Sequence, residues 1–284
     1  MTARILDITP EQYHRDPCSR PSLSCSIAKI LVTKSPLHAW TAHPQFGNVR
    51  EEATQPQDDG SIIHKLLLGK GVDVEVITGF ANFKKKAAQE LRDAATEAGK
   101  IPMLEQKYAA IQAAAEVLRA NLAEQGVELN GASEVAIEWE AAGNDGPVLC
   151  RSMLDHVFID AGRIIDLKKI TSADSFTCEN HGYRYGYDMQ CHAYPLALAA
   201  LRPGLVGRVE FSFAFMEIEP PYAVRVVPPN GEMRALGEMR WGRAVALWER
   251  CAARNRWPGY NETIAPLGVP GWAIRQEEAL GASW

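Results

Sequence analysis

The chain has 284 residues, 30 of them Lys or Arg and 35 Asp or Glu, so its formal net charge is -5 at pH 7. That charge argues against a general polyanion binder, while a hydrophobic content of 46% is typical of a globular protein with its own core. The sequence lacks both a transmembrane stretch and the apolar run of a signal peptide, which predicts a cytoplasmic location. The six cysteines form no C-x-x-C pair, which predicts reduced, buried thiols.

The N-terminal part of the chain reads as an entry segment followed by helices. Residues 1–59 are rich in Ser, Pro and His and are predicted as an arm, with one short helix at about 24–33. Residues 60–284 are predicted as a single domain. Helical patterns cover 60–68, 80–98 and 102–125, and Gly126 is the expected stop of the last one.

From Glu134 onward the pattern changes to alternating apolar and polar residues. Three strands are predicted over 134–141, 148–160 and 163–170. A polar linker, a helix over 188–201, two strands meeting at Pro220–Pro221 and a helix over 231–255 follow, and an irregular tail closes the chain. This order predicts one α/β core with N-terminal helical decoration.

Two carboxylates and an ammonium fall close together on the second predicted hairpin. If residues 160–163 form its turn, Asp155 pairs with Lys168 and lies diagonal to Asp166, at roughly 7–8 Å on the same face. Carboxylates at this spacing can hold a divalent cation, and the ammonium can orient a water and stabilise negative charge, as phosphodiester hydrolysis requires. An exposed hairpin with an Asp–Lys cross-strand pair remains the alternative.

Two further patterns fit such a site. Gln190 and Tyr194 are four residues apart on a predicted helix and share a face, where an amide and a phenol can hold a phosphate or base. His64 lies in an otherwise apolar helix, where a neutral imidazole is a suitable third metal ligand. A helix-surface contact and a core histidine are the respective alternatives.

Taken in order, the motifs G-x-x-x-H (60–64), Asp155, D-x-K (166–168) and Q-x-x-x-Y (190–194) resemble the PD-(D/E)xK nuclease superfamily, in the branch with RecB-type and RecE-type exonuclease domains. The closest resemblance is to the RecE (exonuclease VIII) family of phage and prophage recombination nucleases. It includes SLSCSIAKILVTKSPLHAW, AATEAGKIPMLEQKYAAI, YRYGYDMQCHAY, NRWPGYNE and VPGWA, and covers nearly the whole chain. It implies a restriction-endonuclease-like α/β core, with a mixed central sheet flanked by helices.

The resemblance also implies roles for individual residues. The implied metal ligands are His64, Asp155, Asp166 and the backbone carbonyl of Leu167. Lys168 would lie beside the attacking water, with Gln190 and Tyr194 beside the bound strand. Glu134 falls where some relatives carry an additional acid, although Glu138 or a structural role reads equally well. Asp166 stands where many members have Glu, which implies slightly different metal geometry.

Contact with DNA requires cations for the phosphates and, at unpaired ends, aromatic rings for the bases. The residues expected in this role are Arg151, Lys169, Arg184 and Tyr185. Tyr183, Tyr185 and Tyr187 alternate along one segment and suit stacking on a frayed end, while core packing explains two of them equally well.

The implied function is a Mg²⁺-dependent exonuclease that degrades one strand of linear duplex DNA from its 5′ end by a two-metal mechanism. Mn²⁺ is expected to substitute, and no iron–sulfur cluster is expected. Such relatives form ring-shaped homo-oligomers and work with a RecT-like single-strand annealing protein in a bacterial host cell, with no membrane association.

A Cas4-like or helicase-linked nuclease is disfavoured by the lack of a C-terminal cysteine cluster. A catalytically silent DNA-binding protein is disfavoured because His64, Asp155, Asp166 and Lys168 are all present.

Overall fold

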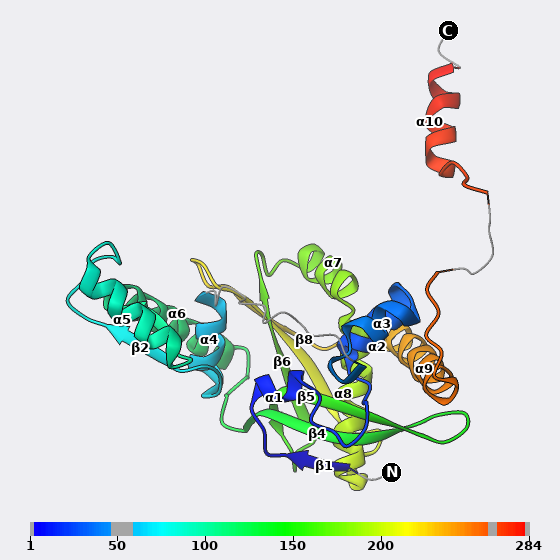
Figure 1. Ribbon diagram of the computed structural model, residues 1–284, viewed down its shortest axis with the longest axis horizontal. Helices are drawn as coiled ribbons and strands as arrows, with labels where there is room; N and C mark the ends of the chain where they lie inside the picture. The colour runs from blue at the N-terminus through cyan, green and yellow to red at the C-terminus, as the bar shows by residue number, and fades with distance from the viewer. Residues whose placement is uncertain (1–2, 47–58, 261–265, 282–284) are drawn as a thin grey trace.

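A six-stranded sheet forms the centre of the protein in a computed structural model, which describes residues 3–46, 59–260 and 266–281 (Figure 1). The strand order is β1-β4-β5-β6-β7-β8, and neighbours are antiparallel except for the parallel pair β6–β7. The strands span Ala3–Leu6 (β1), Ala132–Ala142 (β4), Pro147–Phe158 (β5), Arg163–Ile170 (β6), Glu210–Glu217 (β7) and Val224–Val227 (β8). The predicted mixed sheet is therefore confirmed.

Helices cover both faces of this sheet. The α-helices are α1 (Pro10–His14), α2 (Cys25–Thr33), α3 (Pro36–Ala42), α4 (Asp59–Leu68), α5 (Lys86–Glu97), α6 (Glu105–Glu124), α7 (Ser175–Tyr185), α8 (Tyr187–Leu201), α9 (Gly231–Arg254) and α10 (Gly271–Gly281). Helices α2, α8 and α9 belong to the core on one face, and α4 and α6 to the core on the other. Beside α4 and α6, the short parallel strands β2 (Val74–Ile77) and β3 (Ile101–Leu104) and helix α5 complete a lateral lobe (Figure 1).

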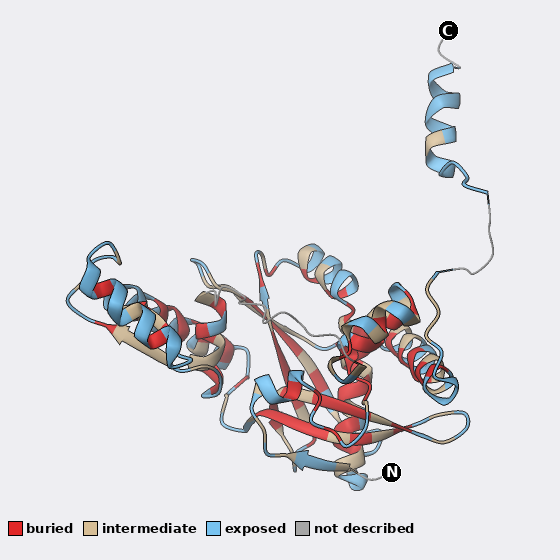
Figure 2. Cartoon of the chain, viewed as in Figure 1, coloured by how far each residue is buried: buried red, intermediate tan, exposed pale blue. Residues whose placement is uncertain are grey.

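The alternation of side chains along β6 explains how one strand serves two cores. Ile164 and Ile170 pack in the core with α8, whereas Ile165 and Leu167 pack in the core with α4 and α6. Strand β7 divides its residues in the same way, and Figure 2 shows the central strands as largely buried. Because successive residues of a strand point to opposite faces, Asp166 shares the face of Ile164.

Most of the predicted elements are confirmed, with small shifts at their ends. The predicted helix 24–33 is α2, whose first turn is capped by the Ser24 hydroxyl, and the 60–68, 188–201 and 231–255 helices are α4, α8 and α9. The helix predicted over 80–98 is confined to α5, and the one over 102–125 begins after β3. All six cysteines are buried and form no disulfide.

The elements that the sequence analysis missed are short or largely exposed. Strands β1, β2 and β3 have only four residues each, too few for alternation to stand out. Helix α7 lies within the predicted polar linker because only Cys178 and Gly182 of its residues are buried. Helix α10, in the tail predicted to be irregular, has no buried residue among those described.

No helix in the described ranges is long and apolar enough to cross a bilayer.

The turn between β5 and β6 differs from the predicted one. Val157 pairs with Ile164 and Phe158 with Arg163, so the turn is residues 159–162 rather than 160–163. Gly162 ends this turn with φ of 68°, a left-handed conformation that glycine adopts at little cost. The pairing shifts by two residues in total, which preserves the face of each side chain but changes the partner of Asp155.

The predicted N-terminal arm joins the sheet and its core in the residues that are described. Strand β1 pairs with β4 at the sheet edge, and Leu23 and Ala28 are fully buried against the rest of the protein. Whether a boundary falls at residue 59 stays a prediction, because residues 47–58 lie outside the described ranges.

A buried polar network ties this N-terminal segment to β5. Arg151 is 3% exposed; its Nη1 donates to the Ser22 carbonyl at 2.6 Å and lies 3.1 Å from Asp16 Oδ2. His43 Nε2 is also 3.1 Å from that oxygen. Burial acts to raise the pKa of Asp16, but hydrogen bonds from His43 and Ser22 and the charge of Arg151 outweigh it and lower that pKa. The prediction that Arg151 contacts DNA is therefore wrong, since its guanidinium is buried among these partners.

We expect Arg151→Met to lower the free energy of unfolding by about 3–5 kcal/mol, because the buried Asp16 carboxylate would lose its cation. Urea denaturation measures this change. The exposed Arg184 offers the control, and Arg184→Met should change stability by no more than about 0.5 kcal/mol. Equal effects of the two substitutions would show that the network contributes no special stability.

Helix α9 contains two glycines in opposite situations. A Cβ at Gly237 would lie 2.0 Å from the Asp188 carbonyl oxygen of α8, whereas one at Gly242 would have no neighbour within 4 Å. Gly237→Ala should destabilise the protein by about 1–3 kcal/mol because α8 and α9 would be forced apart. Gly242→Ala should stabilise it by about 0.5–1 kcal/mol through helix propensity. Thermal unfolding of both variants tests this opposite response, and a stable Gly237→Ala variant would contradict the close packing.

Candidate active site

Three acidic residues, called the acidic row below, lie level with one another on neighbouring strands β4, β5 and β6. Extending the register of the paired residues places Glu134 opposite Asp155, and Asp155 opposite Asp166. Directly opposed residues direct their side chains to the same face of a sheet. The sequence analysis placed Asp155 opposite Lys168; the observed turn instead brings it level with Asp166.

Asp166 is fully buried and forms an ion pair with Lys168 through Oδ2. Burial, opposed by the Lys168 ammonium and reinforced by the Asp155 carboxylate, raises the pKa of Asp166 to about 7. Burial acts to lower the pKa of Lys168, but the two carboxylates outweigh it and raise that pKa. Lys168 is therefore held as a cation between the acids.

Asp155 is fixed by the backbone of the neighbouring strand. Its Oδ2 accepts a hydrogen bond of 2.9 Å from the Leu167 N–H. Burial raises the pKa of Asp155, opposed by the Lys168 charge and by this hydrogen bond. The Leu167 side chain packs in the opposite core, so this residue takes part in the site through its backbone.

Helix α4 brings His64 to the same site. His64 Nδ1 lies 3.5 Å from Glu134 Oε1, at the distance of an ion pair. Burial nevertheless lowers the pKa of His64 and raises that of Glu134, in each case against the attraction of the other group. Both shifts weaken the ionic character of this contact. A neutral imidazole keeps a lone pair for a metal.

Some buried carboxylate oxygens of this site lack a hydrogen-bond donor in the part of the chain that the structure describes. Among the described residues, Asp166 Oδ1 and Glu134 Oε2 have no hydrogen-bond donor although both are buried, while Asp166 Oδ2 is paired with the Lys168 ammonium. Buried carboxylate oxygens without donors are unusual and fit a hard divalent cation as the missing partner. In the same described ranges, no three His, Cys, Asp or Glu side chains are already grouped closely enough to hold a metal.

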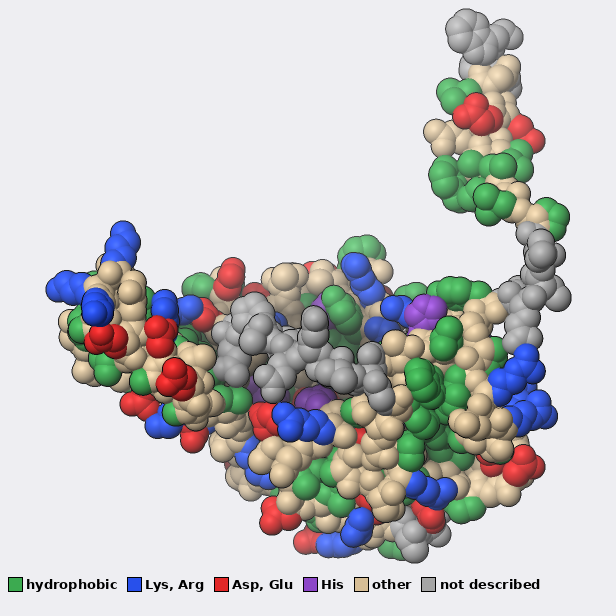
Figure 3. Space-filling model, in the orientation of Figure 1, with side chains coloured by type: hydrophobic (Ala, Val, Ile, Leu, Met, Phe, Trp, Pro, Cys, Tyr) green, Lys and Arg blue, Asp and Glu red, His purple; other side chains and the backbone are tan. Residues whose placement is uncertain are grey.

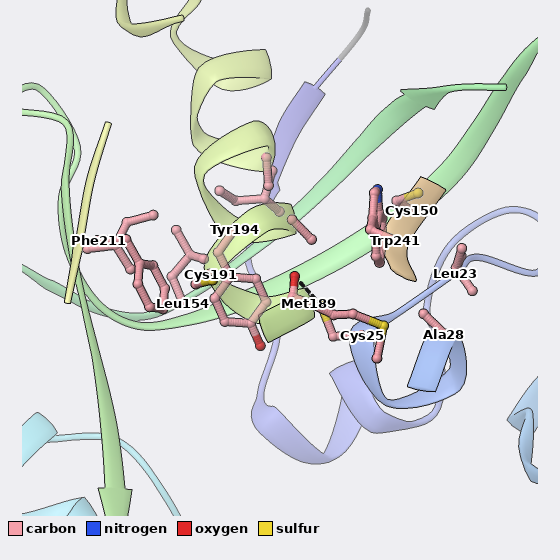
Figure 4. Packing of buried hydrophobic residues seen from close by; sticks show 14 of the residues in the cluster. Leu23, Cys25, Ala28, Cys150, Leu154, Met189, Cys191, Tyr194, Phe211 and Trp241 are labelled. Atoms are coloured by element: carbon pink, nitrogen blue, oxygen red, sulfur yellow. Dashed lines mark hydrogen bonds between the residues drawn. The ribbon is translucent and has the colours of Figure 1, made fainter. Parts of the chain in front are cut away.

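Gln190 and Tyr194 are in contact on α8, as their spacing predicted. Gln190 Nε2 donates to Tyr194 Oη at 3.0 Å, and Gln190 Oε1 is buried without a donor in the described chain. Figure 4 shows Tyr194 in the packed layer between α8 and α2, where Cys25 Sγ donates to the Met189 carbonyl at 3.9 Å. Burial raises the pKa of Tyr194, with smaller contributions from Asp166 and Asp155. The pair is therefore close to the acidic row rather than on the outer helix surface.

The other expected DNA-contacting residues are on the surface. Arg184 and Lys169 are exposed, and the Tyr185 side chain is 48% exposed. Figure 3 shows Lys and Arg side chains beside apolar ones over the region of α7 and α3. Unlike Arg151, these three residues are therefore exposed at the surface.

One further residue of the site is Tyr187, the first residue of α8. The Lys168 ammonium lies 4.6 Å from the centre of its ring, within the range of a cation–π interaction. The Tyr187 hydroxyl is 3.2 Å from His181 Nδ1. The sequence analysis considered Tyr187 only for stacking or core packing. Its helical spacing of three from Gln190 and seven from Tyr194 is the signal that places it on their face.

Comparisons with known proteins identify a family and a fold. Residues 24–267 match the model of a family described as a PDDEXK-like domain of unknown function (DUF3799). A search of the curated proteins finds no match to this chain.

Two solved structures are similar to this one. The first, a "Putative exonuclease" from Eubacterium rectale, is 13% identical; the match covers 95% of this chain and 98% of that one, with a TM-score of 0.56. The second, a phage related exonuclease from Haemophilus somnus 129PT, is 10% identical over 82% of this chain and 96% of that one, with a TM-score of 0.35. The first likeness shows a shared fold.

We expect Asp166→Asn to weaken binding of Mn²⁺ at least about tenfold, because the carboxamide removes the charge of a fully buried carboxylate from the acidic row. Isothermal titration calorimetry with Mn²⁺ alone measures this. The control is Asp160→Asn in the turn of the same hairpin, where the side chain is 95% exposed and binding should not change. Unchanged Mn²⁺ affinity in Asp166→Asn would remove Asp166 from the proposed ligands.

Proposed function

Because the chain belongs to the PDDEXK-like family DUF3799, we propose that it is a nuclease whose active site is the acidic row on β4, β5 and β6. The observation that carries this proposal is the fully buried Asp166 carboxylate, which pairs with Lys168 through Oδ2 while its Oδ1 has no hydrogen-bond donor among the described residues. A structural salt bridge gains its stability from satisfied hydrogen bonds, whereas this arrangement leaves Oδ1 free for a ligand.

The proposed metal ligands are Asp155, Asp166 and His64 with the Leu167 carbonyl, and Glu134 is included because it lies level with Asp155 and contacts His64. The chemistry that Mg²⁺ supplies when bound is polarisation of the phosphoryl oxygen and a lower pKa for the attacking water. We propose that Mn²⁺ can substitute for Mg²⁺.

The chain's own residues supply orientation and charge. Lys168, whose ammonium lies over the Tyr187 ring, is proposed to donate a hydrogen bond to the attacking water or to the phosphate and to offset the charge that develops there. Gln190 and Tyr194 border the site with an amide oxygen and a hydroxyl, which suits positioning of the strand that is cut.

The finer proposal follows the sequence resemblance to RecE-type nucleases. We propose degradation of linear double-stranded DNA from the 5′ end, leaving 3′ single-stranded tails for recombination. A ring-shaped homo-oligomer and a RecT-like annealing partner belong to the same proposal. Lys169, Arg184 and Tyr185 are exposed and are proposed to contact the DNA.

We expect Asp166→Ala and Lys168→Ala each to reduce hydrolysis of linear duplex DNA at least about 100-fold, as the loss of a group that stabilises transition-state charge does. The measurement uses Mg²⁺, linear duplexes blocked at one end at a time, and closed circular DNA, which should resist attack.

Lys100→Ala is the matched control, because Lys100 is a partly exposed lysine of the lateral lobe that pairs with Glu75. Its activity should equal that of the parent. Cleavage that needs no metal, or that survives both active-site substitutions, would contradict the proposed site. Attack on closed circles would contradict the exonuclease proposal alone.

A further inference from the structure

Two exposed tyrosines and two cations lie together on the surface next to the candidate active site. The Tyr183 and Tyr185 side chains are 65% and 48% exposed. The Arg240 guanidinium of α9 lies 5.0 Å from the Tyr183 ring centre, and the Lys29 ammonium of α2 lies 5.3 Å from that of Tyr185. We call these four residues the tyrosine–cation surface.

The cations of this surface are held in place. Arg240 Nη1 lies 3.1 Å from Asp188 Oδ1 at the start of α8, which fixes the guanidinium beside Tyr183. The stem of Lys29 runs past Gly186, where an added Cβ would lie 3.1 Å from its Cδ. Gly186, with φ of 72°, separates α7 from α8 and so sets Tyr185 on one side of the turn and Tyr187 on the other.

The surface is continuous with the catalytic lysine. The Tyr185 and Tyr187 rings are stacked with their centres 6.1 Å apart, and the next neighbour of Tyr187 is the Lys168 ammonium at 4.6 Å. Outward from the buried Asp166, the path therefore runs from the Lys168 ammonium over the stacked rings of Tyr187 and Tyr185 to the Lys29 ammonium. A ligand that follows this path meets a positive charge beside each exposed ring.

We propose that the tyrosine–cation surface binds unpaired nucleotides of the DNA strand next to the active site, with bases on Tyr183 and Tyr185 and phosphates near Lys29 and Arg240. Single-stranded nucleic acid presents free base faces and a regular negative charge, and base–aromatic stacking with nearby cations is the usual way to bind it without sequence preference. Bases inside a duplex are already stacked and offer no free face. This proposal rests on the proposed nuclease function for the identity of the polymer as DNA.

The test is a binding assay that needs no hydrolysis. Fluorescence anisotropy would compare a labelled oligothymidylate with a blunt duplex, both with phosphorothioate linkages and in EDTA. The double substitution Tyr183→Ala/Tyr185→Ala should weaken binding of the single strand at least about tenfold and change duplex binding much less. Tyr260→Ala, at a tyrosine that is 69% exposed near α3, is the matched control and should change neither.

Two further variants separate stacking and charge from a loss of folding. Tyr183→Phe/Tyr185→Phe keeps both rings and should bind the single strand like the parent. Lys29→Gln should reduce the slope of log affinity against log salt concentration by about 0.7, the value for one phosphate contact with a single strand. Unchanged single-strand affinity in the double alanine variant, or an equal loss for single strand and duplex, would overturn the proposal. If the parent binds single strands in this way but degrades no DNA, only the nuclease proposal fails.

Discussion

A carboxylate buried in the middle of a sheet is the constraint on which the rest of this structure depends. Asp166 is fully buried on β6, level with two further acids on β5 and β4. Removing such a charge from water costs several kcal/mol unless a partner compensates for it. Lys168, two residues further along the same strand, is that partner here, and Oδ1, which has no donor among the described residues, is left for a second cation.

The fold around this row buries most of it and supplies the remaining side chains of the site. Strand β6 is covered on both faces, by the core with α8 and by the core with α4 and α6. Two of these helices also carry side chains of the site, namely His64 from α4 and the Gln190–Tyr194 pair from α8. The elements that bury the acidic row therefore also supply polar groups to the site.

The outer boundary of the site has a different character. From Lys168 outward, the stacked rings of Tyr187 and Tyr185 lead to the Lys29 ammonium at the surface. The N-terminal segment contributes to both regions, since α2 supplies Lys29 and the Asp16–Arg151 network anchors this segment to β5. A chain with a net charge of -5 can thus present a local cationic path beside an acidic centre.

The sequence by itself determined the α/β core, the order of the motifs and the presence of Asp155, Asp166 and Lys168 on one hairpin. These follow from local periodicity, which depends only on neighbouring residues. The partner of Asp155 depended on the tertiary structure, because the turn that ends at the left-handed Gly162 lies one residue earlier than expected and shifts the strand pairing by two residues. The tertiary structure alone showed that Arg151 is buried, since its partners Asp16 and Ser22 are more than a hundred residues away along the chain. It also brought Glu134, Tyr187 and Lys29 around the site, because strand register and helix packing join segments that no local pattern connects.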